Sequence, residues 1–419
     1  MKPGIILLIS LSLLLNYCSA EEDSNVSAAR EILKEVPVVD GHNDLPWRIR
    51  DKHSNHLGQV DLRDTTKLEY HTDIPRLRQG MVGGQFWSVY VPVDNSGPQA
   101  VQMVFEQIDV VHRFVEQYSD AFEMAFTAAD IQRISKNGKV ASLIGVEGGH
   151  SINNSLAVLR ELFLAGARYM TLTHWKNTDW ADAATDDPKH NGLTPFGEQV
   201  VREMNRLGML VDLSHVSAET MNDTLALTRA PVIFSHSSAR SISGHPRNVP
   251  DEILKRLPAN GGVVLVNFAP SFVSEEARMH SAVQEGEKAR LKELLVGNPE
   301  ALKQETEAWD KAHPSPGATM QQLADHIDYI RKTAGIDHVG IGSDLDGISK
   351  TPVGLEDVTR YPYLFAELLK RGYSRDDIKK IAGLNILRVM KKTEETAALI
   401  RKESRPSDLL IEEVTAPVQ

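Results

Sequence analysis

Five side chains of the types that bind metal ions occur in this sequence, each at or just after the end of a short apolar run: His42, Asp44, Glu147, His215 and His236. His42 and Asp44 are two residues apart, and residues with this spacing point the same way in an extended segment, so they could bind one ion together. His215 and His236 could bind a second ion, and Glu147 could bridge both ions through its two oxygens. Two such ions would generate a bridging hydroxide and polarise a carbonyl group, which is hydrolytic chemistry.

These side chains can meet only if the apolar runs before them are neighbouring parallel strands. Short apolar runs alternate along the chain with longer amphipathic segments, a pattern typical of βα units. The predicted strands are Val38–Asp40, Gly84–Val91, Val140–Val146, Tyr169–Thr173, Met209–Leu213, Val232–Ser235, Val263–Phe268 and Val339–Gly342. Helices predicted between them include Gln99–Tyr118, Ser155–Leu164, Phe196–Leu207, Ala218–Leu227, Met320–Lys332 and Tyr363–Leu369. Eight units predict an α/β fold of the (β/α)8 type, whose active site lies at the carboxyl ends of the strands.

Length and composition agree with one large barrel domain over residues 21–419. The chain has 419 residues, of which 41% are hydrophobic, and a net charge of −11. This charge argues against a nucleic-acid partner. Residues 274–316, after the seventh strand, are long and charged, which predicts a helical insertion. A solvated surface helix is the favoured interpretation, and a lid over the barrel mouth is the alternative.

The N-terminus has the pattern of an export signal. Lys2 precedes an apolar run at residues 5–15, too short to span a bilayer comfortably, so we expect residues 1–20 to be a cleaved signal peptide. The alternative is a lipoprotein signal that ends before Cys18, the only cysteine, which would carry a lipid anchor. Either interpretation predicts an exported protein, periplasmic or secreted, without a transmembrane span.

Longer motifs around these residues resemble those of the membrane (renal) dipeptidase family, which is similar to the amidohydrolase barrels. The resemblance runs from about Val38 to Met390, and the segments that carry it are Val38–Pro46, Gly83–Ser88, Ile144–Ser151, Leu172–His174, Phe234–Ser237, Arg247–Pro250 and Gly342–Gly347. Animal cell-surface members have several cysteines and a C-terminal lipid-anchor signal, whereas Cys18 is the only cysteine here and the C-terminal residues have no apolar run of the kind that such a signal needs. The resemblance therefore favours a bacterial-type member.

The resemblance implies a zinc-dependent dipeptidase that cleaves L-Xaa-L/D-Xaa dipeptides. It implies two zinc ions, held by the five ligands named above. A homodimer is a separate expectation for this chain. The resemblance further implies that His174 stabilises the oxyanion, Asp344 shuttles the proton and Arg247 binds the substrate carboxylate. The residue types alone do not separate Asp344 from Asp346 two positions later. A tyrosine that the family can place near the substrate carboxylate corresponds here to Phe272.

A second arginine in the loop of Arg247 suggests substrate specificity. Arg240 lies four residues after His236. If Arg247 binds the α-carboxylate, Arg240 could face the side chain of the C-terminal residue, which predicts a preference for dipeptides ending in Asp or Glu. The alternative is that Arg240 points to solvent or pairs with a surface carboxylate.

Three other functions remain open at this stage. Another two-metal barrel amidohydrolase, such as a lactonase, would commonly bridge its metals with a modified lysine rather than a glutamate. A barrel deaminase would need only one metal ion. A non-catalytic binding protein on the same fold would normally have lost a ligand, and none of the five is missing here.

Overall fold

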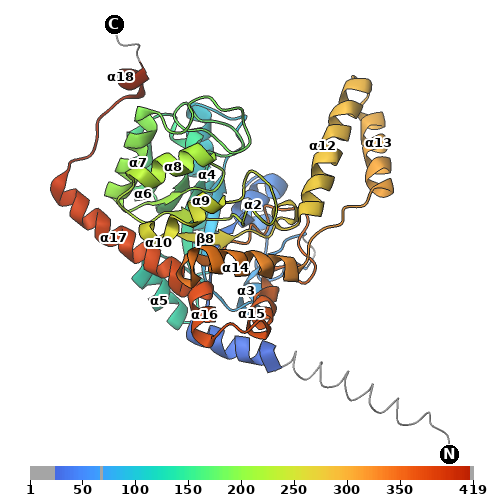
Figure 1. Cartoon of the computed structure of the whole chain (residues 1–419), viewed down its shortest axis with the longest axis horizontal. Coiled ribbons are helices and arrows are strands. Elements are labelled where there is room, and N and C mark those ends of the chain that lie inside the picture. The colour runs from blue at the N-terminus through green and yellow to red at the C-terminus, as the bar shows by residue number, and fades with distance from the viewer. Residues whose placement is uncertain (1–23, 67–68, 416–419) are drawn as a thin grey trace, which may run out of the picture.

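A closed ring of parallel strands forms the centre of the computed structural model, which describes residues 24–66 and 69–415 (Figure 1). The strands are β1 (Val38–Asn43), β2 (Val82–Tyr90), β3 (Phe122–Met124), β4 (Val140–Glu147), β5 (Ala167–Thr171), β6 (Leu210–Asp212), β7 (Ile233–Phe234), β8 (Val263–Val266) and β9 (Val339–Ile341). Their order is β2-β1-β9-β8-β7-β6-β5-β4-β3, and a further pairing of β2 with β4 closes the barrel. The prediction of an eight-stranded (β/α)8 barrel is confirmed.

The short strand β3 was not predicted from the sequence. It pairs with residues Val140 to Ser142 at the start of β4. Strand β5 pairs with the same edge of β4, but further along the strand, at residues Ile144 to Val146. With only three residues, it is too short to show the periodicity by which strands are recognised.

Burial on both faces explains why the barrel strands are apolar. All six residues of β1 and all eight of β4 are buried. A parallel strand covered on both sides has no solvent face, so its sequence is a nearly continuous apolar run rather than an alternating one.

Helices surround the barrel, and several begin at clear sequence signals. A helix over residues 24–35 precedes β1. The other α-helices of the barrel are α2 (Leu45–His53), α3 (Ile74–Gln79), α4 (Pro98–Gln117), α5 (Ala128–Lys136), α6 (Leu156–Leu164), α7 (Pro195–Leu207), α8 (Ala218–Leu227), α9 (Asp251–Leu254), α10 (Leu257–Asn260), α11 (Pro270–Val273), α14 (Met320–Ala334), α15 (Tyr361–Lys370), α16 (Arg375–Lys379) and α17 (Asn385–Glu403), and a short α18 (Ile411–Thr415) follows. The side chain of Thr194 caps α7 by accepting a hydrogen bond from the amide of Gly197, and Pro195 occupies the first turn. The predicted helices agree closely with these bounds.

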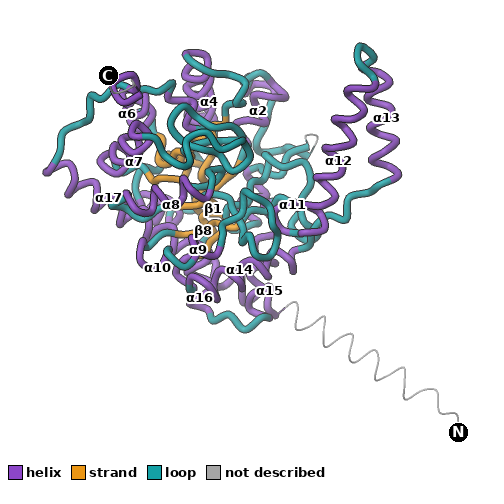
Figure 2. Tube along the Cα trace, turned by 45° about the horizontal axis from the view of Figure 1, so that its top comes forward, coloured by secondary structure: helices purple, strands orange, loops and turns teal. Residues whose placement is uncertain are grey.

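The insertion after β8, the seventh barrel strand, forms a helical hairpin that projects from the body (Figures 1 and 2). It consists of α12 (Glu275–Leu294) and α13 (Pro299–Ala312). Only Ala277 and Leu291 of α12 are buried, and α13 buries no side chain. No residue of either helix lines the cavity at the barrel mouth, so the hairpin stands in solvent rather than covering that cavity.

Two N-terminal predictions, a leader over residues 1–20 and a lipid anchor at Cys18, lie outside the described residues. Within the part of the chain that the structure does describe, no helix combines the length and apolarity needed to cross a bilayer.

Candidate metal centre

The five predicted ligands meet at the carboxyl ends of the barrel strands. His42 lies in β1, and Asp44 follows directly at the start of α2. Glu147 is the last residue of β4. His215 follows β6 and His236 follows β7. In a parallel barrel all these ends open on one face, which explains how residues 194 positions apart along the chain come together (236 − 42).

Glu147 stands at the centre of this cluster, with its two carboxylate oxygens directed to different partners. Its Oε2 lies 3.4 Å from Nε2 of His42, which is itself 3.2 Å from Oδ2 of Asp44. Its Oε1 lies 3.1 Å from Nε2 of His215 and 3.4 Å from Nε2 of His236. The carboxylate therefore joins a His–Asp pair on one side to a His–His pair on the other.

The chemistry of these groups fits metal ions. Nε2 of His42 is buried without a hydrogen-bond partner among the described residues, although it points into the cluster. Burial, together with the nearby Arg247 and His42 respectively, holds the pKa values of His215 and His236 well below the usual range, so both imidazoles are neutral and able to ligate. Burial opposes the charge of Glu147, but His42, His215 and His236 hold the pKa of its carboxyl well below its ordinary value. Neutral imidazoles with carboxylates suit zinc.

Hydrogen bonds from outside the cluster orient two of the histidines. Nδ1 of His236 lies 2.7 Å from Oγ of Ser235, whose hydroxyl donates to Oδ2 of Asp212 at 2.5 Å. Nδ1 of His42 lies 2.8 Å from the hydroxyl oxygen of Tyr169. A proton on Nδ1 of each ring would leave the Nε2 lone pairs facing the centre of the cluster.

Two of the residues that line the cavity have a left-handed backbone conformation. His215 has a φ of +74° and Asp344 a φ of +63°. For a residue other than glycine this left-handed conformation costs on the order of 1–2 kcal/mol, and it is retained mainly where the surrounding structure enforces it.

Asp344 and Asp346 have different surroundings, which the sequence did not distinguish. Asp344 lines the cavity, and its Oδ2 accepts a hydrogen bond of 2.9 Å from the amide of Asn267. Burial raises the pKa of its carboxyl well above the ordinary value. Asp346 instead accepts a hydrogen bond of 2.7 Å from the backbone N–H of His71 and does not line the cavity. Asp344 is therefore the aspartate available for chemistry.

A cavity of about 400 Å³ lies above the cluster and contains His174 and Arg247. Nε2 of His174 is 3.6 Å from Oε1 of Glu147, and burial lowers the pKa of His174 to about 3, so this ring is neutral at pH 7. Arg247 is fully buried, and its side-chain hydrogen bonds to other described residues are long, 3.5 Å to Oγ of Ser237 and 3.4 Å to the carbonyl of His236. Burial lowers the pKa of Arg247 to about 10, which leaves it charged at neutral pH.

The structure does not support the substrate contact expected of Arg240. Its guanidinium donates to the carbonyl oxygens of Asn248 at 2.9 Å and Pro246 at 2.7 Å. Arg240 is absent from the cavity wall, whereas Arg247 forms part of it. These contacts hold Arg240 against the loop segment that carries Arg247. They match neither of the two alternatives expected from the sequence, a side chain in solvent or an ion pair with a surface carboxylate.

Aromatic residues that the sequence did not single out complete the cavity wall. Trp47 and Tyr90 line it and pack edge to face, with ring centroids 4.8 Å apart. Trp175 also lines the cavity, whereas Trp87 and Trp180 are fully buried packing residues. Phe272 also lines it, with its ring 5.4 Å from the guanidinium carbon of Arg247, and the remaining lining residues are Ala269, Ser271, Gly347 and Ile348.

A parallel barrel with a His–carboxylate cluster at its strand ends has the architecture of a metal-dependent hydrolase. The model of the membrane dipeptidase family (peptidase family M19) matches residues 26–404. Dipeptidase verJ of Clonostachys rogersoniana is 41% identical over 391 residues, which cover 91% of this chain and 90% of that protein. The chain therefore belongs to the membrane dipeptidase family.

Solved structures show the same fold. The probable dipeptidase PvdM from Pseudomonas aeruginosa superposes with a TM-score of 0.74 at 24% identity, covering 89% of this chain and 99% of that one. A metallo peptidase from Rhodobacter sphaeroides, solved with a phosphinate mimic of the dipeptide L-Ala-D-Ala, superposes with a TM-score of 0.70 at 24% identity, covering 85% and 99%.

Proposed function

We propose that this member of a metallo-dipeptidase family hydrolyses L-Xaa-L/D-Xaa dipeptides with two zinc ions. The observation that carries the proposal is the position of Glu147, whose two oxygens face His42 and the His215–His236 pair separately. One ion would be held by His42 and Asp44, the other by His215 and His236, with Glu147 between them. None of the described cavity-lining residues is a lysine, which favours this arrangement over a lysine-bridged amidohydrolase.

Zinc bound at this cluster would activate a water as hydroxide and polarise the scissile carbonyl. Asp344, at the cavity wall, would accept the proton from that water and deliver it to the leaving amino group. The neutral imidazole of His174 would donate a hydrogen bond to the carbonyl oxygen as negative charge develops there.

The buried cation Arg247 explains the proposed restriction to dipeptides. Its guanidinium makes only long hydrogen bonds to the residues that the structure describes, so donors remain for a substrate carboxylate. A cavity of about 400 Å³ is near the lower end of the range for small-molecule sites, about 300–1,000 Å³. A dipeptide would suit both features, because it is small and has a free carboxylate one residue from the scissile bond.

The preference for an acidic C-terminal residue stays a prediction with weaker support. It was expected from Arg240, which would have to leave the carbonyl groups of Pro246 and Asn248 to reach the substrate. Arg247 is the only Lys or Arg among the described residues of the cavity wall.

A dipeptide library tests the proposal. The purified chain, loaded with zinc, is incubated with dipeptides that carry L- or D-residues at the C-terminal position, and free amino acids are measured. Metal content is determined in parallel, and two zinc ions per chain are expected. Hydrolysis of no dipeptide by a fully loaded protein would refute the proposed function. One tightly bound zinc per chain would favour a deaminase.

We also propose that the protein is exported, on the basis of the basic start and the apolar run at residues 5–15. N-terminal sequencing and mass determination of the mature protein distinguish cleavage after Ala20 from lipid attachment at Cys18. An unprocessed N-terminus in the native host would contradict export through such a signal.

A further inference from the structure

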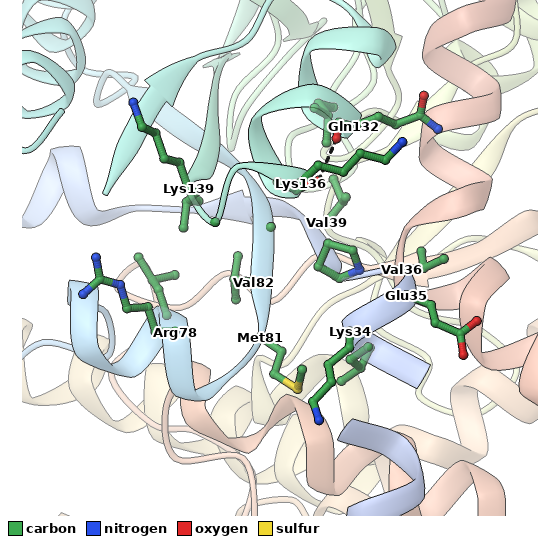
Figure 3. Close-up of a pocket in the computed structure, with 18 of the residues that line it drawn as sticks. Lys34, Glu35, Val36, Val39, Arg78, Met81, Val82, Gln132, Lys136 and Lys139 are labelled. Atoms are coloured by element: carbon green, nitrogen blue, oxygen red, sulfur yellow. Dashed lines mark hydrogen bonds between the residues drawn. The ribbon is translucent and has the colours of Figure 1, made fainter. Parts of the chain in front are cut away.

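A second cavity, of about 350 Å³, lies where the barrel strands begin, at the opposite end of the barrel from the candidate metal centre. Figure 3 shows residues that line it. The cavity is bounded by the first residues of the strands, among them Val39 of β1, Val82 of β2 and Val140 of β4, and by helices α3 and α5. The metal cluster lies at the last residues of the same strands, so the two cavities are separated by the packed interior of the barrel.

The wall of this second cavity is apolar. Val39, Val82, Phe122 and Ile131 line it and are nearly fully buried. Leu384 lines it from the segment before α17 and remains 38% exposed, which makes it one of the large apolar side chains left in contact with water. The remaining apolar lining residues are Leu33, Val36, Pro37, Ile74, Leu77, Met81, Ala121, Val140 and Leu387.

Basic residues surround this apolar wall. Lys34, Arg78, Lys136 and Lys139 all belong to the lining, and Figure 3 shows them spread around the apolar side chains. Among the residues that the structure describes, Arg78 and Lys136 form no ion pair, whereas Lys34 pairs with Glu31 and Lys139 with Glu123. A cluster of four cations is notable on a chain whose net charge is −11.

The single acidic residue of the lining does not neutralise these cations. The carboxylate of Glu35 binds Arg375 at 2.8 Å and Lys379 at 2.6 Å, and neither of these residues lines the cavity. Two unpaired cations thus stand beside an apolar cavity large enough for a small ligand.

We infer that this cavity binds a single-chain amphiphile with an anionic head group, such as a medium-chain fatty acid. The alkyl chain would occupy the apolar wall, and the head group would lie at the rim near Lys136 and Arg78, whose flexible side chains can reach it. The unpaired cations Arg78 and Lys136 at the rim favour a ligand with an anionic head over a purely apolar one, and the apolar wall favours it over a simple inorganic anion. The site is separate from the proposed dipeptidase chemistry and does not depend on it.

Calorimetric titration of the zinc-loaded protein with sodium dodecanoate, below its micelle concentration, tests the inference. Saturable binding of about one molecule per chain is expected, and dodecyltrimethylammonium, which has the same chain and a cationic head, should bind roughly tenfold more weakly or not at all. Absence of dodecanoate binding, or equal binding of both amphiphiles, would overturn it.

Two variants with matched controls locate the site. Lys136→Glu removes a rim cation, and the exposed Lys303→Glu on α13 makes the same charge change on the distant hairpin. Leu384→Glu places a charge in the apolar wall, and Leu399→Glu alters another exposed leucine of the same helical segment. Each cavity variant should weaken dodecanoate binding roughly tenfold, and each control should leave it unchanged.

Other modes of binding give distinct results. If saturating dipeptide abolishes dodecanoate binding while Leu384→Glu does not, the acid occupies the metal cavity and the inference is wrong. If the protein sediments with anionic phospholipid vesicles but does not bind free dodecanoate, the basic residues adsorb to a surface and the cavity has no ligand role.

Discussion

The Nδ1 atom of His42 lies 2.8 Å from the hydroxyl oxygen of Tyr169, and both side chains are fully buried. This contact leaves Nε2 of His42 as the atom that faces Asp44 and Glu147. A residue in β5 thus orients the ring of a residue in β1 so that its Nε2 faces the candidate metal site.

Tyr169→Phe should therefore weaken zinc binding. Loss of such an outer hydrogen bond typically costs about ten- to a hundredfold in metal affinity. Competition with a chromophoric chelator measures this affinity directly, without reference to activity. Tyr329→Phe, which removes a hydroxyl that binds Asp251 on the barrel's outer surface, is the control and should leave the zinc affinity unchanged.

Glu147→Gln should weaken binding of both metal ions, because a neutral amide is a poor bridge between two cations. Metal analysis after dialysis against a weak chelator checks this, with wild-type protein expected to retain two zinc ions. Ser88 donates to Oε2 of Glu147 at 2.9 Å, so Ser88→Ala should produce a smaller loss in the same direction. Retention of two ions at unchanged affinity by the Gln variant would remove Glu147 from the bridging position.

Asp344→Asn should lower kcat by about a hundred- to ten-thousandfold, the usual effect of losing a general acid–base group. Its metal content should remain close to that of the wild type. Asp346→Asn is the matched comparison, because Asp346 binds the backbone of His71 rather than the cavity. Asp346→Asn should reduce the stability of the fold more than it reduces kcat. A near-normal kcat in Asp344→Asn would show that another group carries the proton.

Arg247 should discriminate a dipeptide from its C-terminal amide. A charge-assisted hydrogen bond contributes roughly 1.5–3 kcal/mol, so the amide should react about ten- to a hundredfold more slowly in kcat/KM. This ratio should approach one in Arg247→Met. Equal wild-type rates on a dipeptide and its amide would exclude Arg247 from carboxylate recognition.

Comparing a Glu with a Gln C-terminal residue, in wild type and in Arg240→Ala, tests the preference for an acidic C-terminal residue.

His326 should make stability depend on pH. Its Nδ1 accepts from the backbone N–H of Ala239 and its Nε2 donates to the carbonyl of Val273, and burial lowers its pKa to about 4. Because this pKa is below the value of about 6.5 expected in the unfolded chain, the stabilisation is complete above pH 6.5 and is lost as the pH falls toward 4. The loss between pH 7 and pH 5 amounts to about 2 kcal/mol.

His326→Gln, which has no titrating group, should lack this part of the pH dependence. Urea unfolding at pH 7 and pH 5 measures it as the difference between the two free energies of unfolding. An identical pH dependence in the variant and the wild type would show that His326 is not the group responsible.

The barrel and the clustering of the candidate metal ligands could be predicted from the sequence because both rest on local patterns. A strand buried on both faces must be an apolar run, and the carboxyl ends of parallel strands meet on one face. Residues at or just after the end of each run are therefore brought together by topology alone, which is why His42, Glu147, His215 and His236 could be grouped from the sequence. The short β3 escaped because three residues are too few for a periodic signal.

Tertiary structure decided what local patterns leave equivalent. Asp344 and Asp346 have the same chemistry and both have positive φ, yet only Asp344 lines the cavity. The side chain of Asn267 donates a hydrogen bond to Asp344, whereas the backbone N–H of His71 donates one to Asp346. Arg240 and Arg247 share one loop, and the path of that loop aims one at its own carbonyl groups and the other at the metal centre. Residue type and spacing determine which chemistry is available, whereas the direction of a side chain depends on packing contacts between residues far apart in the sequence.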